Sequence, residues 1–257
     1  MSHLKILMSN IAYARGFDGA LGTHVGRAYR HLYCSTAVQK RVMGDVKRLL
    51  DHEQPDVCCF VEVERGGKGA KSFDQLRSLL DERFMYADIA NKYFAKGGYK
   101  WLPVLGRKCN AFCSNRPLEF EHVYLDAGIK RLVYKITINP RLTLFFAHFS
   151  LRRSVRRLQF AGLRRVLRFT PGEHIVMGDF NIFGGAEELA PFLRKTKLLV
   201  VNDPELPTFR FHRSRALVDL AMCSPGIRDR AALRIVEQHY SDHAALILDL
   251  HAVKLAR

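Results

Sequence analysis

Nine short apolar runs are spread along the sequence, and they are the feature that most restricts its fold. Several of them are continuously apolar rather than alternating, which is typical of strands covered on both faces. The chain is therefore expected to build buried sheets from many short strands. The runs fall at residues 3–10, 56–63, 103–113, 131–138, 142–149, 173–178, 197–202, 217–223 and 243–250.

The connections between the runs indicate how the strands and helices alternate. The tripeptide Asn-Pro-Arg joins 131–138 to 142–149, which predicts an antiparallel hairpin. No repeat, low-complexity tract or Pro/Ser-rich linker interrupts the chain, so a single domain over residues 1–257 is expected.

Two segments have clear helical periodicity. One covers 36–52, with Ser35 as the expected N-cap, and the other covers 154–168, with Ser154 in the same role. Strands interspersed with helices in one chain predict an α/β (α+β) fold, in which sheets pack together and helices lie outside. Residues 12–33 and 64–72 lack a clean period and are expected to be loops that border a site.

Composition narrows the class of partner and the compartment. Lys and Arg number 41 against 25 Asp and Glu, a net charge of +16 that favours nucleic acid or an anionic membrane surface without distinguishing them. The six cysteines form no C-x-x-C pair, which favours free thiols in a reducing compartment. With no secretory leader pattern and no apolar stretch of spanning length, a cytoplasmic location is expected, and no obligate protein partner is inferred.

The segment HIVMGDFNIFGG, at 174–185, places polar side chains at the end of an apolar run. On an extended backbone Asp179 and Asn181 would point the same way, while Phe180 would point into the core. Taken alone, a turn or a helix cap explains these residues equally well.

Other apolar runs contain or end in similar groups. Asn10 ends the first run, Glu62 lies within the second, His148 ends the run LTLFFAHFS, and Asp242 and His243 open the last. Burying an unpaired charge is expensive, so these groups need a partner, a metal ion or water.

Seven short segments occur in the order and approximate spacing of one known superfamily. The sequence resembles the endonuclease/exonuclease/phosphatase superfamily, the DNase I-like metal-dependent phosphoesterases, over nearly its whole length. The resemblance implies a four-layer sandwich, with two central mixed β-sheets flanked by helices and the site at the sheet ends. The segments are LMSNIA, PDVCCFVEV, CNAFCSNRPL, AHFS, GDFN, LVDLAMCS and SDHAAL; the GDFN and SDH segments are the most specific.

The resemblance also implies a metal ion and an activated water. Glu62 would be the main Mg²⁺ ligand, assisted by Asn10 and Asp242, and Mn²⁺ is an alternative metal. Asp179 would align or deprotonate the attacking water. These roles agree with phosphodiester chemistry, because a hard cation held by carboxylate and amide oxygens offsets the negative charge that develops on the phosphoryl group.

The remaining matched positions are implied to hold the phosphate. Asn181 would bind it, His243 paired with Asp219 would contact it or act as acid or base, and His148 would bind it from the leaving-group side. Asn110 would support phosphate binding. A carboxylate beside a histidine favours the charged imidazole, which suits a group that meets a phosphate.

The sequence departs from the family pattern at a few positions. Val61 stands where Gln is common before the metal-binding Glu, Phe149 replaces a common Leu, and Leu220 follows the Asp that pairs with the site histidine. None of these changes removes a functional group, so they put the subfamily in doubt rather than the chemistry. Glu64 competes with Glu62 for the ligand role, and the spacing along the segment favours Glu62.

A basic amphipathic segment at 152–168 holds seven arginines. A solvated outer helix face is the favoured interpretation, and an anchoring surface for nucleic acid or anionic lipid is the alternative. On a helix, Arg157, Arg164 and Arg168 would line one stripe, opposite a broad arc of Val155, Leu158, Leu163 and Val166.

Basic residues in the expected loops are better candidates for substrate contacts: Arg15, Arg65, Lys68, Lys71, Arg213 and Arg215. The favoured function is metal-dependent hydrolysis of a phosphoester, with nucleic acid as the first substrate because of the net charge. Two alternatives stay open. One is a phosphodiesterase or phosphatase for a phospholipid or inositol-phosphate headgroup, and the other is a non-catalytic binding scaffold of the same fold.

Overall fold

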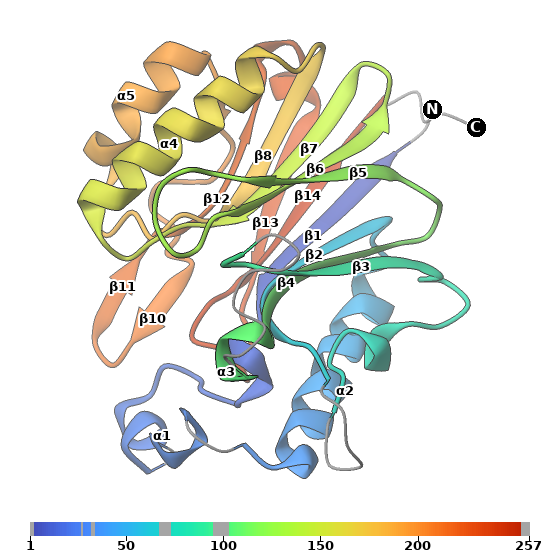
Figure 1. Cartoon of the computed structure of the whole chain (residues 1–257), viewed down its shortest axis with the longest axis vertical. Coiled ribbons are helices and arrows are strands. Elements are labelled where there is room, and N and C mark those ends of the chain that lie inside the picture. The colour runs from blue at the N-terminus through green and yellow to red at the C-terminus, as the bar shows by residue number, and fades with distance from the viewer. Residues whose placement is uncertain (1–2, 27, 32–33, 67–72, 95–102, 253–257) are drawn as a thin grey trace.

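The structure is a computed structural model, and it describes residues 3–26, 28–31, 34–66, 73–94 and 103–252. Two six-stranded mixed sheets lie at its centre (Figure 1). The spatial order of sheet 1 is β13 (Ala231–Val236), β14 (Ala245–Leu250), β1 (Leu4–Asn10), β2 (Val57–Glu64), β4 (Lys108–Ser114) and β3 (Tyr86–Asn91). The strands β1 and β2 are parallel, and the other neighbours are antiparallel.

Sheet 2 has the same plan, with one parallel pair, β7 and β8, among antiparallel neighbours. A separate ribbon is formed by β10 (Phe209–Phe211) and β11 (Ser214–Ala216). The spatial order of sheet 2 is β5 (Glu119–Tyr124), β6 (Leu132–Asn139), β7 (Leu142–His148), β8 (Glu173–Asp179), β12 (Asp219–Cys223) and β9 (Leu199–Val200).

Helices cover the outer faces of the two sheets. Helix α2 (Thr36–Glu53) packs on sheet 1, while α4 (Arg153–Arg168) and α5 (Ala186–Thr196) lie side by side on sheet 2 (Figure 1). Shorter helices occupy the connections. These are α1 (Leu21–Gly26), α3 (Pro103–Gly106) and the 3₁₀ turns η1 (Ala12–Ala14), η2 (Ala28–His31), η3 (Arg77–Leu79) and η4 (Pro225–Arg230).

Three separate apolar cores hold these layers together. In β1 the alternate residues Ile6 and Met8 enter the core between the sheets, whereas Leu7 enters the core under α2. Phe180, at the end of β8, is fully buried in the third core, between sheet 2 and its helices. Burial of strands on both faces explains why their sequences are continuously apolar. The four-layer sandwich of the expectation is therefore confirmed.

Several local expectations are confirmed and others are wrong. The β6–β7 hairpin is present, and Ser35 caps α2 by accepting a hydrogen bond from the Val38 amide at 3.4 Å. The cap of α4 is Arg152 rather than Ser154, and residues 103–106 are helical rather than the start of a strand. The irregular segment 12–33 contains η1, α1 and η2, and residues 67–72 of the second expected loop lie outside the described part of the chain.

The basic segment forms α4, but its faces differ from the expected ones. The stripe of Arg157, Arg164 and Arg168 is exposed, as predicted, whereas Leu158 is also 61% exposed. Arg156 is buried instead. Its guanidinium donates to both carboxylate oxygens of Glu188 in α5, at 2.6 and 2.8 Å, which ties the two helices together. An arginine that forms two parallel hydrogen bonds to a carboxylate tolerates burial where an unpaired charge would not.

Two further expectations concern cysteines and membranes. All six cysteines are free thiols, five of them buried. Within the described residues, the helices are too short or too polar to cross a bilayer.

Candidate active site

The site lies between the two sheets, where strand ends bring polar side chains together. In sheet 2, His148, Asp179 and Asp219 occupy paired positions on the adjacent strands β7, β8 and β12. From sheet 1 come Asn10, at the end of β1, and Glu62, near the end of β2. Parallel strands end at the same edge of a sheet, so β1 with β2 and β7 with β8 each deliver two groups to one place.

Asp179 is the centre of this cluster and is 1% exposed. Its Oδ2 lies 3.0 Å from Asn10 Nδ2, 3.2 Å from His148 Nε2 and 4.0 Å from His243 Nε2. Its Oδ1 accepts a hydrogen bond from the Asn181 amide at 3.1 Å. Burial raises the pKa of Asp179 above its usual value, so the carboxylate is a stronger base than an exposed aspartate.

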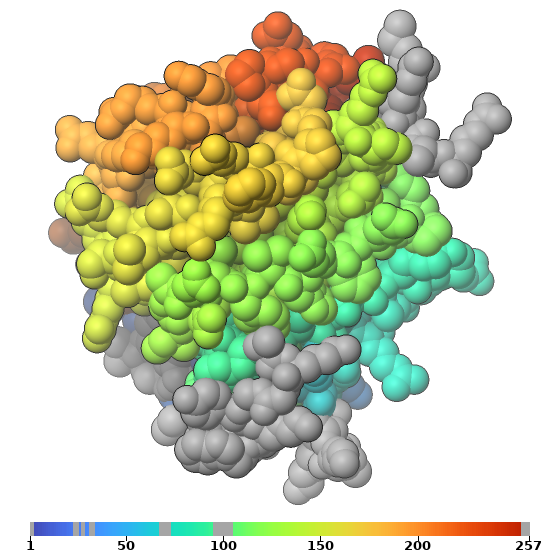
Figure 2. Space-filling view, turned by 45° about the horizontal axis from the view of Figure 1, so that its top comes forward, coloured from blue at the N-terminus to red at the C-terminus, as the bar shows by residue number. Residues whose placement is uncertain are grey.

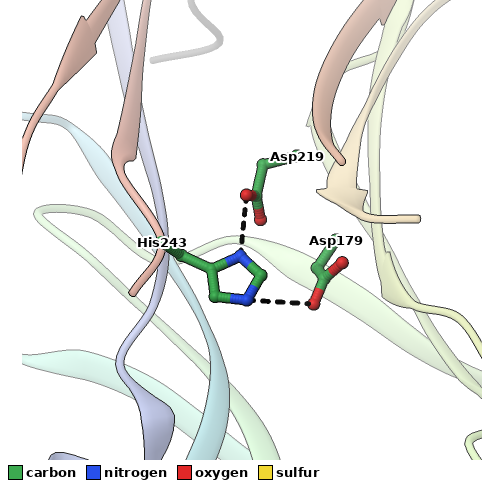
Figure 3. A group of neighbouring side chains, drawn as sticks. All are labelled: Asp179, Asp219 and His243. Carbon is green, nitrogen blue, oxygen red and sulfur yellow. Dashed lines mark hydrogen bonds and ion pairs between the residues drawn. The ribbon is translucent and has the colours of Figure 1, made fainter. Parts of the chain in front are cut away.

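His243 and Asp219 form a buried ion pair (Figure 3). Nδ1 of His243 lies 2.8 Å from Oδ2 of Asp219, and Nε2 points toward Asp179. Burial alone would lower the pKa of His243, but the Asp219 and Asp179 carboxylates outweigh it and raise the pKa to about 10. The imidazole is therefore a cation at neutral pH.

The start of β10 fixes this pair in place. Thr208 Oγ1 accepts hydrogen bonds from the amides of Val218 and Asp219, at 3.1 and 2.9 Å. The ring of Phe209 packs on the imidazole of His243, with 4.9 Å between the centroids. Backbone and aromatic contacts thus orient both partners of the pair.

Glu62 occupies a bulge in β2 and has a left-handed backbone, with φ of 58°. Such a conformation is uncommon for a residue other than glycine, and it turns the side chain out of the regular strand alternation. Its Oε1 lies 3.2 Å from Lys92 Nζ and 3.8 Å from His148 Nδ1. Burial alone would raise the pKa of Glu62, but the Lys92 and Lys130 ammonium groups lower it to about 2.

His148 lies between two charged groups. Its Nε2 contacts the ammonium of Lys130 as well as the carboxylate of Asp179. Burial and then the positive charges of Lys130 and Lys92 hold the pKa of His148 well below its usual range, so the ring is neutral. Burial and the nearby Lys92 also lower the pKa of Lys130 to about 8.

The chain leaves its extended conformation directly after Asp179. Asn181 has a φ of 53°, so the expectation that Asp179 and Asn181 lie on one extended backbone is wrong. The Asn181 side chain instead donates to the carbonyl of Phe149 at 3.1 Å, while its backbone amide holds Asp179. Strained positions of this kind concentrate at functional sites.

The other expected site residues differ in their burial and in their contacts. Asn110 lies in β4 and is fully buried, and among the described residues neither atom of its amide has a hydrogen-bond partner. Asp242 is half-buried and lines a small cavity beside His243 and Glu237. Glu64 faces Lys108, at 3.6 Å, rather than the cluster.

The two loop arginines differ in setting. The guanidinium of Arg15 lies over the Tyr13 ring, 5.1 Å from its centroid, and this ring lies beside Lys92. Arg65 is exposed, and its guanidinium donates to the carbonyl of Ile89 at the edge of sheet 1. Arg15 therefore shares an aromatic neighbour with Lys92, whereas the contact of Arg65 lies at the edge of sheet 1.

Lys92 and Lys130 are the members of the cluster that sequence reasoning missed. Lys92 follows β3, a strand that the sequence did not predict, and Lys130 precedes β6. Lysines at strand ends are common on protein surfaces, so neither position carried a signal of its own.

The donor set fits a hard divalent cation. The carboxylates of Asp179 and Asp219 each offer an oxygen, and these two atoms lie within 4.8 Å of each other, whereas the charged imidazole of His243 beside them is a donor and not a ligand. Glu62 and Asn10 add carboxylate and amide oxygens, the ligands that Mg²⁺ prefers. The unpartnered amide of Asn110 and the unpartnered Oδ1 of Asp219 are buried polar atoms that a bound ion, its water or a phosphate would satisfy.

Similarity to solved structures establishes the fold. A protein described as endonuclease/exonuclease/phosphatase from Beutenbergia cavernae shares 16% identity at a TM-score of 0.67, over 96% of this chain and 71% of that one. Truncated Caenorhabditis elegans TDP2 shares 16% identity at a TM-score of 0.64, over 97% and 98%. An AP endonuclease from Archaeoglobus fulgidus shares 14% at 0.61, over 97% and 100%.

The family model identifies the family to which the chain belongs, whereas the solved structures show its fold. Among curated proteins no match to this sequence was found. The sequence model of the Endonuclease/Exonuclease/phosphatase family matches residues 38–243, most of the 257, and this region includes every member of the cluster except Asn10. The chain therefore belongs to the endonuclease/exonuclease/phosphatase family.

Proposed function

We propose that the protein is a metal-dependent hydrolase of phosphodiester bonds and that nucleic acid is its favoured substrate. Membership of a family of metal-dependent phosphoesterases supports the general chemistry. The observation that carries the proposal is the position of Asp179, whose Oδ2 lies within 4.0 Å of Asn10, His148 and His243. One buried carboxylate surrounded by an amide and two imidazoles suits the activation of water beside a phosphate.

The acidic and amide side chains divide between metal binding and water activation. Glu62, Asn10 and Asp242 would hold Mg²⁺ or Mn²⁺, which when bound would neutralise charge on the phosphoryl oxygens. Asp179 accepts the proton of the attacking water or aligns it, a role favoured by the raised pKa of its carboxyl group.

The nitrogen-bearing side chains would bind the phosphate. The imidazolium of His243, held by Asp219, donates a charged hydrogen bond to a phosphoryl oxygen. Asn181 and Asn110 supply amide groups, and the unpartnered Asn110 amide gains the hydrogen bonds that it lacks. His148 faces the leaving-group side as a neutral ring.

Charge supports nucleic acid as the substrate. The net charge of +16 attracts a polyanion, and Arg215 lines the cavity beside His243 together with Phe209. Arg15 lies over the ring of Tyr13, which also borders Lys92. Contacts of this kind with a phosphate backbone weaken steeply with salt.

A specific observation favours an anionic membrane lipid as the second candidate. On α4 and its flanks, Leu151, Leu158 and Phe169 are 65%, 61% and 76% exposed beside the exposed arginines. The surfaces of α4 and α5 adjoin in the yellow and orange region of Figure 2. Apolar side chains flanked by arginines are typical of a helix that lies on a bilayer.

A hydrolysis panel separates the two substrates. Single-stranded DNA, duplex with an abasic site, RNA, sphingomyelin and phosphoinositides would be compared with Mg²⁺ present. We expect a nucleic acid to be cleaved, and Arg213→Ala with Arg215→Ala to reduce kcat/KM roughly tenfold, with a weaker dependence on salt. The matched control is Arg157→Ala with Arg164→Ala on α4, which should leave cleavage nearly unchanged. Cleavage of lipid headgroups alone would contradict nucleic acid as the substrate.

A further inference from the structure

Two lysine ammonium groups point into the cluster from opposite sheets. Lys92 follows β3 of sheet 1, is 1% exposed and lies 3.2 Å from Glu62 Oε1. Lys130 precedes β6 of sheet 2, and its Nζ contacts Nε2 of His148. A buried ammonium is expensive unless it is paired, so two of them in one site call for a functional explanation.

The lysines change the charge of the site. Glu62, Asp179 and Asp219 contribute three carboxylates, and His243 contributes one positive charge. Without the lysines the cluster would carry excess negative charge and repel a phosphate. With Lys92 and Lys130 the positive groups balance these three carboxylates before any metal ion binds, which leaves only the half-buried Asp242 beside His243 as excess negative charge and so lowers that repulsion.

Both ammonium groups retain hydrogen-bonding capacity. An ammonium has three N–H donors. Within the described residues, Lys92 Nζ contacts one carboxylate, that of Glu62, and otherwise faces the rings of Tyr13 and Tyr93, at 4.9 and 5.5 Å from their centroids. Each lysine therefore has donors left for a phosphoryl oxygen.

Lys108 shows what a lysine outside the cluster does. Its ammonium lies 3.6 Å from a carboxylate oxygen of Glu64 and 3.6 Å from the Tyr13 ring centroid. Lys108 thus pairs with a carboxylate outside the cluster, whereas Lys92 and Lys130 contact Glu62 and His148 within it.

We propose that Lys92 and Lys130 bind the phosphate group directly, so that the site captures a phosphate without a divalent cation. The inference rests on the proposed function, since it assigns the phosphate to the same cluster. The two lysines add a fixed pair of cations to the donors of His243 and the asparagines. Charge-assisted hydrogen bonds from ammonium to phosphate are among the stronger polar contacts in proteins.

Calorimetric binding of inorganic phosphate in the presence of EDTA tests the proposal. We expect the wild-type protein to bind phosphate, and Lys92→Met or Lys130→Met to weaken binding roughly tenfold or more, with a larger loss in the double variant. Lys92→Arg should restore part of the affinity because it keeps the charge.

The matched control is Lys135→Met. Lys135 lies on β6 and pairs at the surface with Glu121, at 3.1 Å, so its loss removes the same charge away from the cluster. Its phosphate affinity should equal that of the wild type. Thermal melting identifies any variant that fails to fold. If Lys92→Met is such a variant, the phosphate affinities of Lys130→Met and Lys92→Arg still test the proposal. Unchanged affinity in a folded double variant, or no phosphate binding by the wild type, would overturn the proposal.

Hydrolysis by the same proteins separates this inference from the proposed function. If the wild type hydrolyses phosphodiesters with Mg²⁺ but the double variant binds phosphate normally in EDTA, the lysine proposal fails alone. If phosphate binding depends on the lysines but no phosphoester is hydrolysed, the catalytic proposal fails alone.

Discussion

Asp179→Asn should reduce the turnover of bis(4-nitrophenyl) phosphate by about 10²–10⁴-fold. The carboxylate is the proposed base, and general base catalysis contributes an acceleration of about that size. The amide keeps the shape of the side chain but accepts no proton. Steady-state kinetics with Mg²⁺ present would measure the loss, which should appear in kcat more than in KM.

The stability of the same variant provides the control. Burial raises the pKa of Asp179, so the ionised carboxylate costs folding free energy at neutral pH. Removing the charge should leave the free energy of unfolding unchanged or raise it. A variant that folds as well as the wild type and hydrolyses the substrate equally fast would exclude Asp179 as the base.

Asp219→Asn should move the alkaline limb of the kcat/KM profile to lower pH by roughly one unit or more, the usual effect of losing an adjacent opposite charge. The Asp219 carboxylate, with that of Asp179, raises the pKa of His243 to about 10 against the effect of burial. Without it, the imidazole loses its proton at lower pH and no longer donates a charged hydrogen bond to the phosphate.

The linked effect on stability has a definite sign. The folded pKa of His243 lies above its unfolded value of 6.5, so its protonation contributes its full stability below 6.5, down to about pH 6, where the buried Asp219 takes up a proton and the ion pair loses its charge. That contribution is lost as the pH rises through about 10. Asp249→Asn is the matched control, because Asp249 pairs with His3 at 2.8 Å on the surface. An Asp219→Asn profile that coincides with the control profile would show that the pair does not set the alkaline limb.

The layers of the fold could be predicted because they follow from local patterns. Runs such as 142–149 and 173–178 are apolar throughout, and this property comes directly from burial on both faces. The edge strands β3, β5 and β13 were missed because at most one residue in each is buried and their sequences are mixed. Helix α5 was missed because Pro191 interrupts its pattern.

The site could be predicted only where a residue interrupts an apolar strand. Asn10, Glu62, His148, Asp179 and the Asp242-His243 pair stand out for this reason, and the family resemblance supplied their roles and the other positions. Lys92 and Lys130 could not be found, because their burial depends on how the two sheets pack rather than on neighbours in sequence. The same holds for the left-handed backbone of Glu62, which arises from a bulge against β4.

The most direct test of the account is the hydrolysis of bis(4-nitrophenyl) phosphate during a Mg²⁺ titration of the wild type and Glu62→Gln. The account predicts turnover that requires Mg²⁺ and is abolished by EDTA, with the variant needing at least about tenfold more Mg²⁺ because it has lost a charged ligand. Equal turnover in EDTA, or the same Mg²⁺ requirement in both proteins, would contradict a metal-dependent site built around Glu62.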